Sequence, residues 1–240
     1  MSFLGEASRF IHVLFGFVGL AAFWIPVFSR KGANLHVRTG KVFVWCAYIV
    51  LAAAAAALLV RSLRMAGEGM TFGSHPDAWG FVIFLGYLSF VTFVTVRHGM
   101  GVLRHKMDPA ALRTPLTVFL ARASIAASVG VIAYAIIVDP QIKLILFALS
   151  PIGFANGFGI LRYTAGNTIS KRAWMYEHLG GMLGAGIAFH TAFAVFGLNQ
   201  MFDLGLSGFL AVIPWVAPAA IGIPAISIWT RHYRRKFGEI

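Results

Sequence analysis

The chain has 240 residues, of which 59% are hydrophobic and 12% are charged, and its mean hydropathy is +0.79. A soluble domain carries about 25% charged residues, so this composition excludes an ordinary soluble protein. The formal charge of +12 would suggest a nucleic-acid partner in a soluble protein. Here the basic residues lie between apolar runs, which is typical of membrane-protein loops and argues against nucleic acid. The single cysteine, Cys46, excludes an internal disulfide and a cysteine-based metal site.

Apolar runs of about 20 residues, long enough to cross the hydrocarbon core of a bilayer, recur along the whole chain. The expected spans cover residues of about 10–29, 42–64, 79–99, 115–138, 142–162, 173–198 and 205–230. We therefore expect a single transmembrane domain over residues 1–240. Its fold class is an all-α integral membrane protein, a bundle of seven transmembrane helices embedded in the lipid bilayer.

Lysine and arginine are unevenly distributed between the loops. The connections after the first, third and fifth spans and the tail carry most of them, including Arg30, Lys31, Arg104 and Lys171. The opposite connections have fewer basic and more acidic residues. The positive-inside rule then predicts an N-terminus outside and a C-terminus in the cytoplasm.

Proline and glycine mark features inside the expected spans. Pro151 in the fifth span and Pro218 and Pro224 in the seventh each remove a helix hydrogen bond, so we expect kinks there. Gly180 and Gly184 in the sixth span have the spacing of close helix contacts.

The sixth span contains three ionisable side chains, Glu177, His178 and His190, in a segment rich in Gly, Ala, Leu, Met and Phe. Such groups cost about 2.5–3.5 kcal/mol each on insertion scales, so they indicate a functional site. His178 and His190 are about 18 Å apart along a helix and about 120° apart around it. They cannot bind one metal ion together, but they could belong to two centres at different depths.

The predicted topology sorts the histidines into two layers. We expect His12 and His190 to face the bundle interior and share one site in the outer layer. His36, His98, His105, Glu177 and His178 lie near the cytoplasmic face. Arg122 is at a depth similar to that of Glu177, so the two opposite charges are predicted to form a buried ion pair. A structural alternative for the intramembrane histidines is simple hydrogen bonding in the core, and for those at helix ends an interfacial position.

Two segments carry a resemblance to a known group of proteins. The first third contains Ile11-His12, Gly16, Gly19, Lys31-Gly32, His36, Arg38, Gly40 and Phe43, and the sixth span contains Trp174, His178, Met182, Thr191-Ala192-Phe193 and Asn199. This pattern resembles a broad, uncharacterised family of predicted bacterial inner-membrane proteins with a histidine- and glycine-containing first span and a KGxxxHRxxGxxF-type loop. The resemblance implies a multi-pass protein of the bacterial inner membrane and includes His12, His36 and His178 in the pattern. It implies no established activity.

Three functions remain open from the sequence. The first is a redox protein that binds haem b and exchanges electrons with a quinone or another redox protein. Its outer haem would be bound by His12 and His190. Its inner haem would be bound by His178 together with His98 or His36. The second is a metal-dependent membrane enzyme with zinc or iron at His36, His98, His178 and Glu177, acting by hydrolysis or oxidation of a lipid. The third is a metal-free transporter or sensor. Each is compatible with a homo-oligomer.

Overall fold

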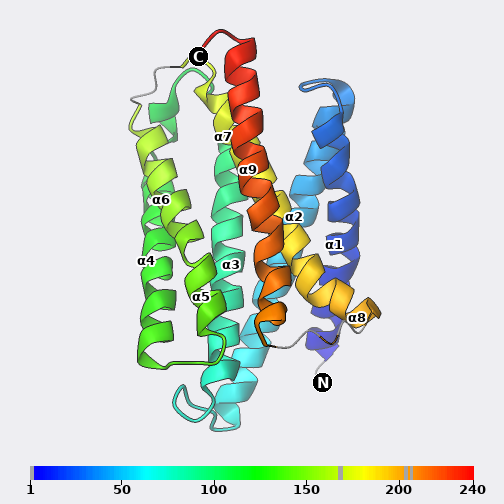
Figure 1. Ribbon diagram of the computed structural model, residues 1–240, viewed down its shortest axis with the longest axis vertical. Coiled ribbons are helices and arrows are strands. Elements are labelled where there is room, and N and C mark those ends of the chain that lie inside the picture. The colour runs from blue at the N-terminus through cyan, green and yellow to red at the C-terminus, as the bar shows by residue number, and fades with distance from the viewer. Residues whose placement is uncertain (1–2, 167–169, 203–204, 206–207) are drawn as a thin grey trace. The chain divides into compact units, whose positions relative to one another are not determined.

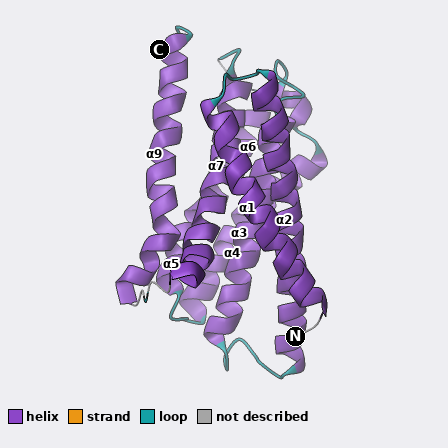
Figure 2. Ribbon diagram, turned by 90° about the vertical axis from the view of Figure 1, so that its right-hand side faces the viewer, coloured by secondary structure: helices purple, strands orange, loops and turns teal. Residues whose placement is uncertain are grey.

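The computed structural model describes residues 3–166, 170–202, 205 and 208–240, and these residues form helices and connections without any β-strand (Figures 1 and 2). Within them, seven helical segments are long and apolar enough to cross a membrane: Glu6–Phe28, Asn34–Gly67, Pro76–Gly101, Pro115–Ile137, Lys143–Thr164, Ala173–Leu198 and Leu210–Lys236. The expectation of seven apolar helical spans is confirmed. Residues 206–207 of the last expected span lie outside the described residues.

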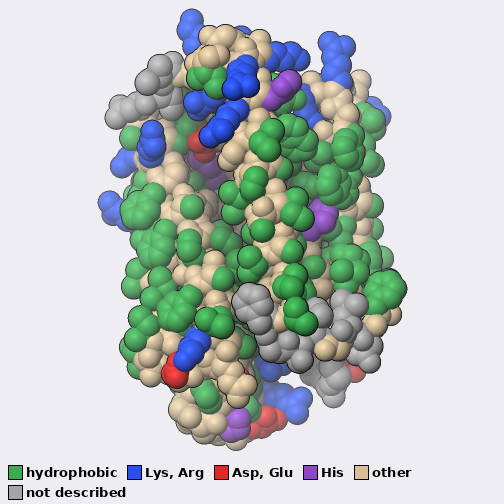
Figure 3. All heavy atoms as spheres, in the orientation of Figure 1, with side chains coloured by type: hydrophobic (Ala, Val, Ile, Leu, Met, Phe, Trp, Pro, Cys, Tyr) green, Lys and Arg blue, Asp and Glu red, His purple; other side chains and the backbone are tan. Residues whose placement is uncertain are grey.

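The helices follow one another in chain order with short connections. They are α1 (Phe3–Phe28), α2 (Asn34–Gly67), α3 (Pro76–Gly101), the 3₁₀ helix η1 (Pro109–Leu112), α4 (Pro115–Ile137), α5 (Lys143–Leu149), α6 (Pro151–Thr164), α7 (Ala173–Ala192), the π-helix η2 (Phe193–Leu198), α8 (Asn199–Phe202), the 3₁₀ helix η3 (Gly208–Val212) and α9 (Ile213–Lys236). Hydrophobic side chains cover the lengths of the helices, and most lysines and arginines gather at helix ends (Figure 3).

The fifth span is divided by Pro151. α5 ends at Leu149 and α6 begins at Pro151, which takes the first helical position. Proline fits there because the first turn needs no hydrogen-bonded N–H, whereas its ring would clash with a continuing preceding turn. The Ser150 hydroxyl donates to the Phe147 carbonyl at 3.1 Å. By contrast, Pro218 and Pro224 lie inside α9, which continues through them.

The chain divides into two compact units, and α3 and α4 each contribute to both. The first unit comprises Met1–Phe93 and Val131–Leu146, and the second comprises Val94–Gly130 and Phe147–Ile240. In the first unit, α1 and α2 pack against each other (Figure 1). Phe23 and Phe43 are buried at this contact with their ring centroids 5.3 Å apart. The tight connection between the two helices uses Gly32 with φ +78°, a conformation that side chains disfavour.

Glycine brings the helices of the second unit close together. A Cβ atom on Gly181 of α7 would lie 2.9 Å from the Gly99 Cα of α3, and one on Gly157 of α6 would clash with the Ala121 carbonyl of α4. Small residues allow such approaches where lipid offers no hydrophobic drive for association. Gly180, one of the glycines singled out in the sequence, has no neighbour within 4 Å of its added Cβ. The contact therefore depends on Gly181.

Candidate functional site

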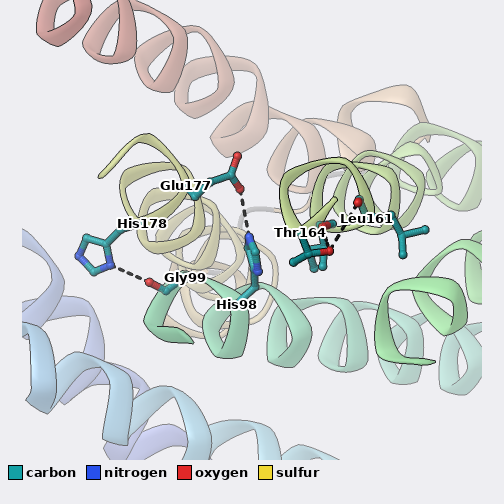
Figure 4. Close-up of polar contacts among 7 residues, drawn as sticks. His98, Gly99, Leu161, Thr164, Glu177 and His178 are labelled. Carbon is teal, nitrogen blue, oxygen red and sulfur yellow. Dashed lines mark hydrogen bonds and ion pairs between the residues drawn. The ribbon is translucent and has the colours of Figure 1, made fainter. Parts of the chain in front are cut away.

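An imidazole and a carboxylate meet between α3 and α7 in the second unit. His98 Nε2 lies 3.1 Å from Glu177 Oε2, and Figure 4 shows the two side chains directed toward each other. The His98 side chain is 9% exposed and that of Glu177 is 35% exposed. One partner is thus enclosed by protein while the other keeps partial access to its surroundings. Such a pair can hold or exchange a proton.

The glycine contact sets the positions of these side chains. Gly99 follows His98 on α3, and its backbone approaches Gly181 on α7. At this separation His178 Nδ1 reaches the Gly99 carbonyl oxygen at 2.8 Å, while the preceding residue, Glu177, reaches His98. Adjacent helix residues project about 100° apart, so Glu177 and His178 contact α3 on different sides (Figure 4).

Tyr163 of α6 completes the enclosed side of the pair. Its ring meets the His98 ring edge-on, with centroids 5.5 Å apart and an interplanar angle of 82°. The residue is 4% exposed, and its buried hydroxyl has no hydrogen-bond partner among the described residues. An unpaired buried hydroxyl costs about 1–3 kcal/mol, which calls for an explanation in terms of function or a further ligand. Sequence reasoning missed Tyr163, because a tyrosine beside Arg162 at a span end is also typical of the membrane interface.

The predicted partner of Glu177 was Arg122, and the structure gives it His98 instead. Arg122 is exposed on α4, and no ion pair joins it to Glu177 among the described residues. Matching depth and opposite charge were the basis of the prediction, but Glu177 contacts His98 and the Arg122 side chain is exposed. Arg122 therefore remains a charged residue in a candidate span that the site does not use.

Four histidines share a single hydrogen-bonding pattern. Nδ1 lies 3.1 Å from the Val50 carbonyl oxygen in His12, 3.1 Å from that of Pro26 in His36, 2.8 Å from that of Gly99 in His178 and 2.7 Å from that of Gly186 in His190. A carbonyl oxygen only accepts, so each Nδ1 carries the proton. In the neutral ring the lone pair is then on Nε2, the tautomer that a metal or haem ligand requires.

The predicted metal ligands do not form one cluster. Among the described residues, no group of three or more His, Cys, Asp or Glu side chains could hold a metal ion. Within the second unit, His178 reaches α3 on a side other than that of His98 and Glu177 (Figure 4). His36 belongs to the first unit. The proposed zinc or iron site at these four residues therefore gains no support from the structure.

The outer-layer site predicted for His12 and His190 involves both units. His12 belongs to the first and His190 to the second, and each is hydrogen-bonded within its own unit. Their sharing of one site stays a prediction. The π-helix η2 begins three residues after His190, a feature that often accompanies functional sites.

A second carboxylate cluster, which the sequence did not predict, lies after α9. Glu239 accepts hydrogen bonds from the Tyr176 hydroxyl and the Ser170 hydroxyl, both at 2.7 Å, and Arg172 lies 3.6 Å from it. The hydrogen bond from Tyr176, followed by that from Ser170, lowers the pKa of Glu239, and the charge of Arg172 acts in the same direction. This cluster fixes the chain after α9 to the start of α7.

No family model, curated protein sequence or solved structure matches this chain.

Proposed function

We propose that this chain is a multi-pass protein of the bacterial inner membrane that translocates protons, with the N-terminus outside and with His98 and Glu177 as its proton-binding site. The observation that carries this proposal is the 3.1 Å contact between His98 and Glu177 on two candidate membrane helices. Ionisable residues inside spans are costly and commonly mark ion pathways and proton relays. This function belongs to the metal-free class of transporters.

The unequal exposure of the pair supports a direction for proton entry. Glu177 is the more exposed partner and His98 is enclosed. A proton would reach the Glu177 carboxylate first and then pass to the His98 ring, which has a second nitrogen for onward transfer. Tyr163, whose hydroxyl has no hydrogen-bond partner in the part of the chain that the structure describes, contacts the His98 ring.

The second unit also carries polar groups at other depths. His190 lies 13 residues beyond Glu177 on the same helix, which corresponds to about 20 Å of a hydrocarbon core about 30 Å thick. Ser124 and Ser128 of α4 are fully enclosed, and Thr191 is buried. The Ser124 and Ser128 hydroxyls donate to the carbonyl oxygens of Leu120 and Ser124 at 3.0 and 3.3 Å. Their oxygens can still accept a hydrogen bond from water, so they could contribute to a polar route through the second unit.

Proton flux into liposomes tests this proposal. The protein is reconstituted in vesicles that contain a pH-sensitive dye, and a potassium gradient with valinomycin imposes a membrane potential. We expect acidification in the wild type and a loss of about a hundredfold in Glu177→Gln and His98→Gln, the scale of a lost acid–base group. Glu68→Gln is the matched control, because Glu68 pairs with Arg64 on the exposed surface. Wild-type flux equal to that of protein-free vesicles, or undiminished flux in Glu177→Gln, would refute the proposal.

A haem-binding redox protein is the second candidate, and the tautomers of His12, His178 and His190 favour it. In each, Nδ1 is bonded to a carbonyl oxygen, as in ligands whose Nε2 binds iron. A bound haem would supply one-electron transfer. His98 fits less well as a ligand, since its Nε2 faces Glu177. A Soret band in the purified protein that weakens in His178→Ala would support this candidate, and no change in absorption on adding haemin would exclude it.

A further inference from the structure

Arg122 is an exposed charged residue in the candidate span formed by α4. It lies seven residues after the start of α4 at Pro115, about 10 Å along the helix axis. Its side chain is exposed, whereas the neighbouring Ala121 and Ser124 are fully buried. An arginine at this depth is costly unless it reaches the headgroup level or meets an anion.

A groove of about 730 Å³ runs along this exposed face of α4. It is lined by Arg113, Pro115, Val118, Phe119, Arg122, Ala123 and Ala126. The helical residues recur at intervals of three and four, so they form one stripe on the helix. Arg113 lies just before the start of α4, and Arg122 lies nine positions further along the stripe, with Val118 and Phe119 between them and Ala123 and Ala126 beyond. No acidic residue lines it.

We propose that this groove binds an anionic phospholipid. Arg113 and Arg122 would bind the lipid phosphate, for which planar guanidinium groups provide paired donors. Phe119, Ala123 and Ala126 would contact the upper part of an acyl chain. Arg113 already donates to the Leu161 carbonyl oxygen at 3.2 Å, which holds the guanidinium near the start of α4. A guanidinium has five N–H donors, so the hydrogen bond to Leu161 leaves others that can bind a phosphate.

The lining identifies a lipid as the occupant. A soluble anion would use the two arginines but would leave the apolar length of the groove uncovered. A phospholipid matches both parts, because its charge lies at the headgroup level and its chain lies deeper. Basic pockets of membrane helices are known to bind anionic headgroups in this way. The inference rests on the membrane location proposed above and is independent of proton translocation.

Native mass spectrometry of the detergent-purified protein tests the site. Phosphatidylglycerol and phosphatidylcholine are titrated separately into the wild type, Arg113→Gln, Arg122→Gln and the double variant. We expect selective phosphatidylglycerol binding, weakened about fivefold by each substitution, the scale of one basic residue at an anionic headgroup. Arg122→Lys keeps the charge but loses the paired donors, so its affinity should lie between those of the wild type and Arg122→Gln. Arg104→Gln is the matched control, since Arg104 is exposed in a loop and does not line the groove.

Four results would overturn the proposal. Unchanged phosphatidylglycerol binding in the double variant would place the lipid elsewhere. Equal binding of phosphatidylcholine would remove the role of the anionic charge. Displacement of the lipid by millimolar inorganic phosphate would mean that the arginines recognise a free anion. A dimer that dissociates in Arg122→Gln would instead assign the groove to a second copy of the chain. The liposome flux assay remains a separate measurement, because Arg122→Gln should translocate protons like the wild type.

Discussion

One histidine of the second unit, His98, has a different kind of partner from His12 and His36 of the first unit. In the first unit, His12 and His36 each place Nδ1 beside a backbone carbonyl oxygen, at 3.1 Å in both cases. In the second unit, His98 meets the carboxylate of Glu177. A carbonyl cannot titrate, so it only fixes the tautomer of the ring. A carboxylate can form a hydrogen bond with a neutral imidazole and an ion pair with a charged one. An intramembrane histidine is therefore a weaker indication of function than the group with which it is paired.

The units also differ in how their helices pack. The α1–α2 contact of the first unit is filled by side chains such as Phe23 and Phe43. At the α3–α7 contact of the second unit, the backbones approach at Gly99 and Gly181. Close backbones leave short side chains such as those of histidine and glutamate within reach across the interface. Packing in the second unit thereby creates the site, and the predictions below test this relation.

The largest expected effect is that of Gly181→Ala. The added Cβ would lie 2.9 Å from the Gly99 Cα and 3.3 Å from the Thr95 carbonyl oxygen. Both are backbone atoms, so the helices themselves must separate. We expect a loss of about 2–3 kcal/mol in the free energy of unfolding, at the upper end for an overpacked contact. Thermal or denaturant unfolding of the detergent-solubilised protein would measure it.

Gly180→Ala is the control for that substitution. A Cβ at Gly180 has no neighbour within 4 Å, so the change should stabilise the helix by about 0.5–1 kcal/mol through the lower entropy of the unfolded chain. If the two variants were equally stable, the close α3–α7 contact would be wrong, and with it the geometry that brings His98 to Glu177.

A smaller effect is expected from breaking the pair. In a double-mutant cycle with His98→Ala and Glu177→Ala, we expect a coupling energy of about 1 kcal/mol, which is modest because Glu177 is partly exposed. His190→Ala combined with Glu177→Ala should be additive, because the two residues lie about 20 Å apart along one helical span. Each single variant should lower the unfolding temperature in the same assay. A coupling near zero for His98 and Glu177 would reduce the pair to two independent side chains.

The sequence predicted those features of the fold that depend on composition along the chain. Apolar length predicted the seven helical spans. The missing N–H of Pro151 led us to expect a kink in the fifth, and the structure divides that span into α5 and α6. The expected start of the second span at residue 42 was late, because Arg38 and Lys41 were taken as loop residues, whereas α2 begins at Asn34. Charged residues can extend a helix beyond the apolar core, so helix ends and membrane boundaries need not coincide.

The candidate site was predicted only in part, because depth is visible in a sequence and direction around a helix is not. His98 and Glu177 were both assigned to one layer, but Glu177 was paired with Arg122. The Gly99–Gly181 contact, which decides which faces meet, depends on two helices far apart in sequence. Tyr163 and Glu239 were missed for a related reason. The sequence around Tyr163 does not indicate its contact with His98, and the sequence around Glu239 does not indicate its contact with Tyr176.

The smallest expected effect concerns pH and the carboxylate of Glu239. Hydrogen bonds from Tyr176 and Ser170 lower the pKa of Glu239 below that of the unfolded chain, which is about 4.3 for a glutamate. The stabilisation is therefore complete above that value and is lost as the pH falls through the folded-state pKa. Glu239→Gln should remove this contribution, so its unfolding temperature should fall less than that of the wild type between pH 6 and pH 3. Glu68→Gln is the control, because Glu68 pairs with Arg64 on the exposed surface. Its unfolding temperature should keep the part of the wild-type pH dependence that comes from Glu239. Identical pH profiles for Glu239→Gln and the wild type would mean that the segment after α9 is not held to α7.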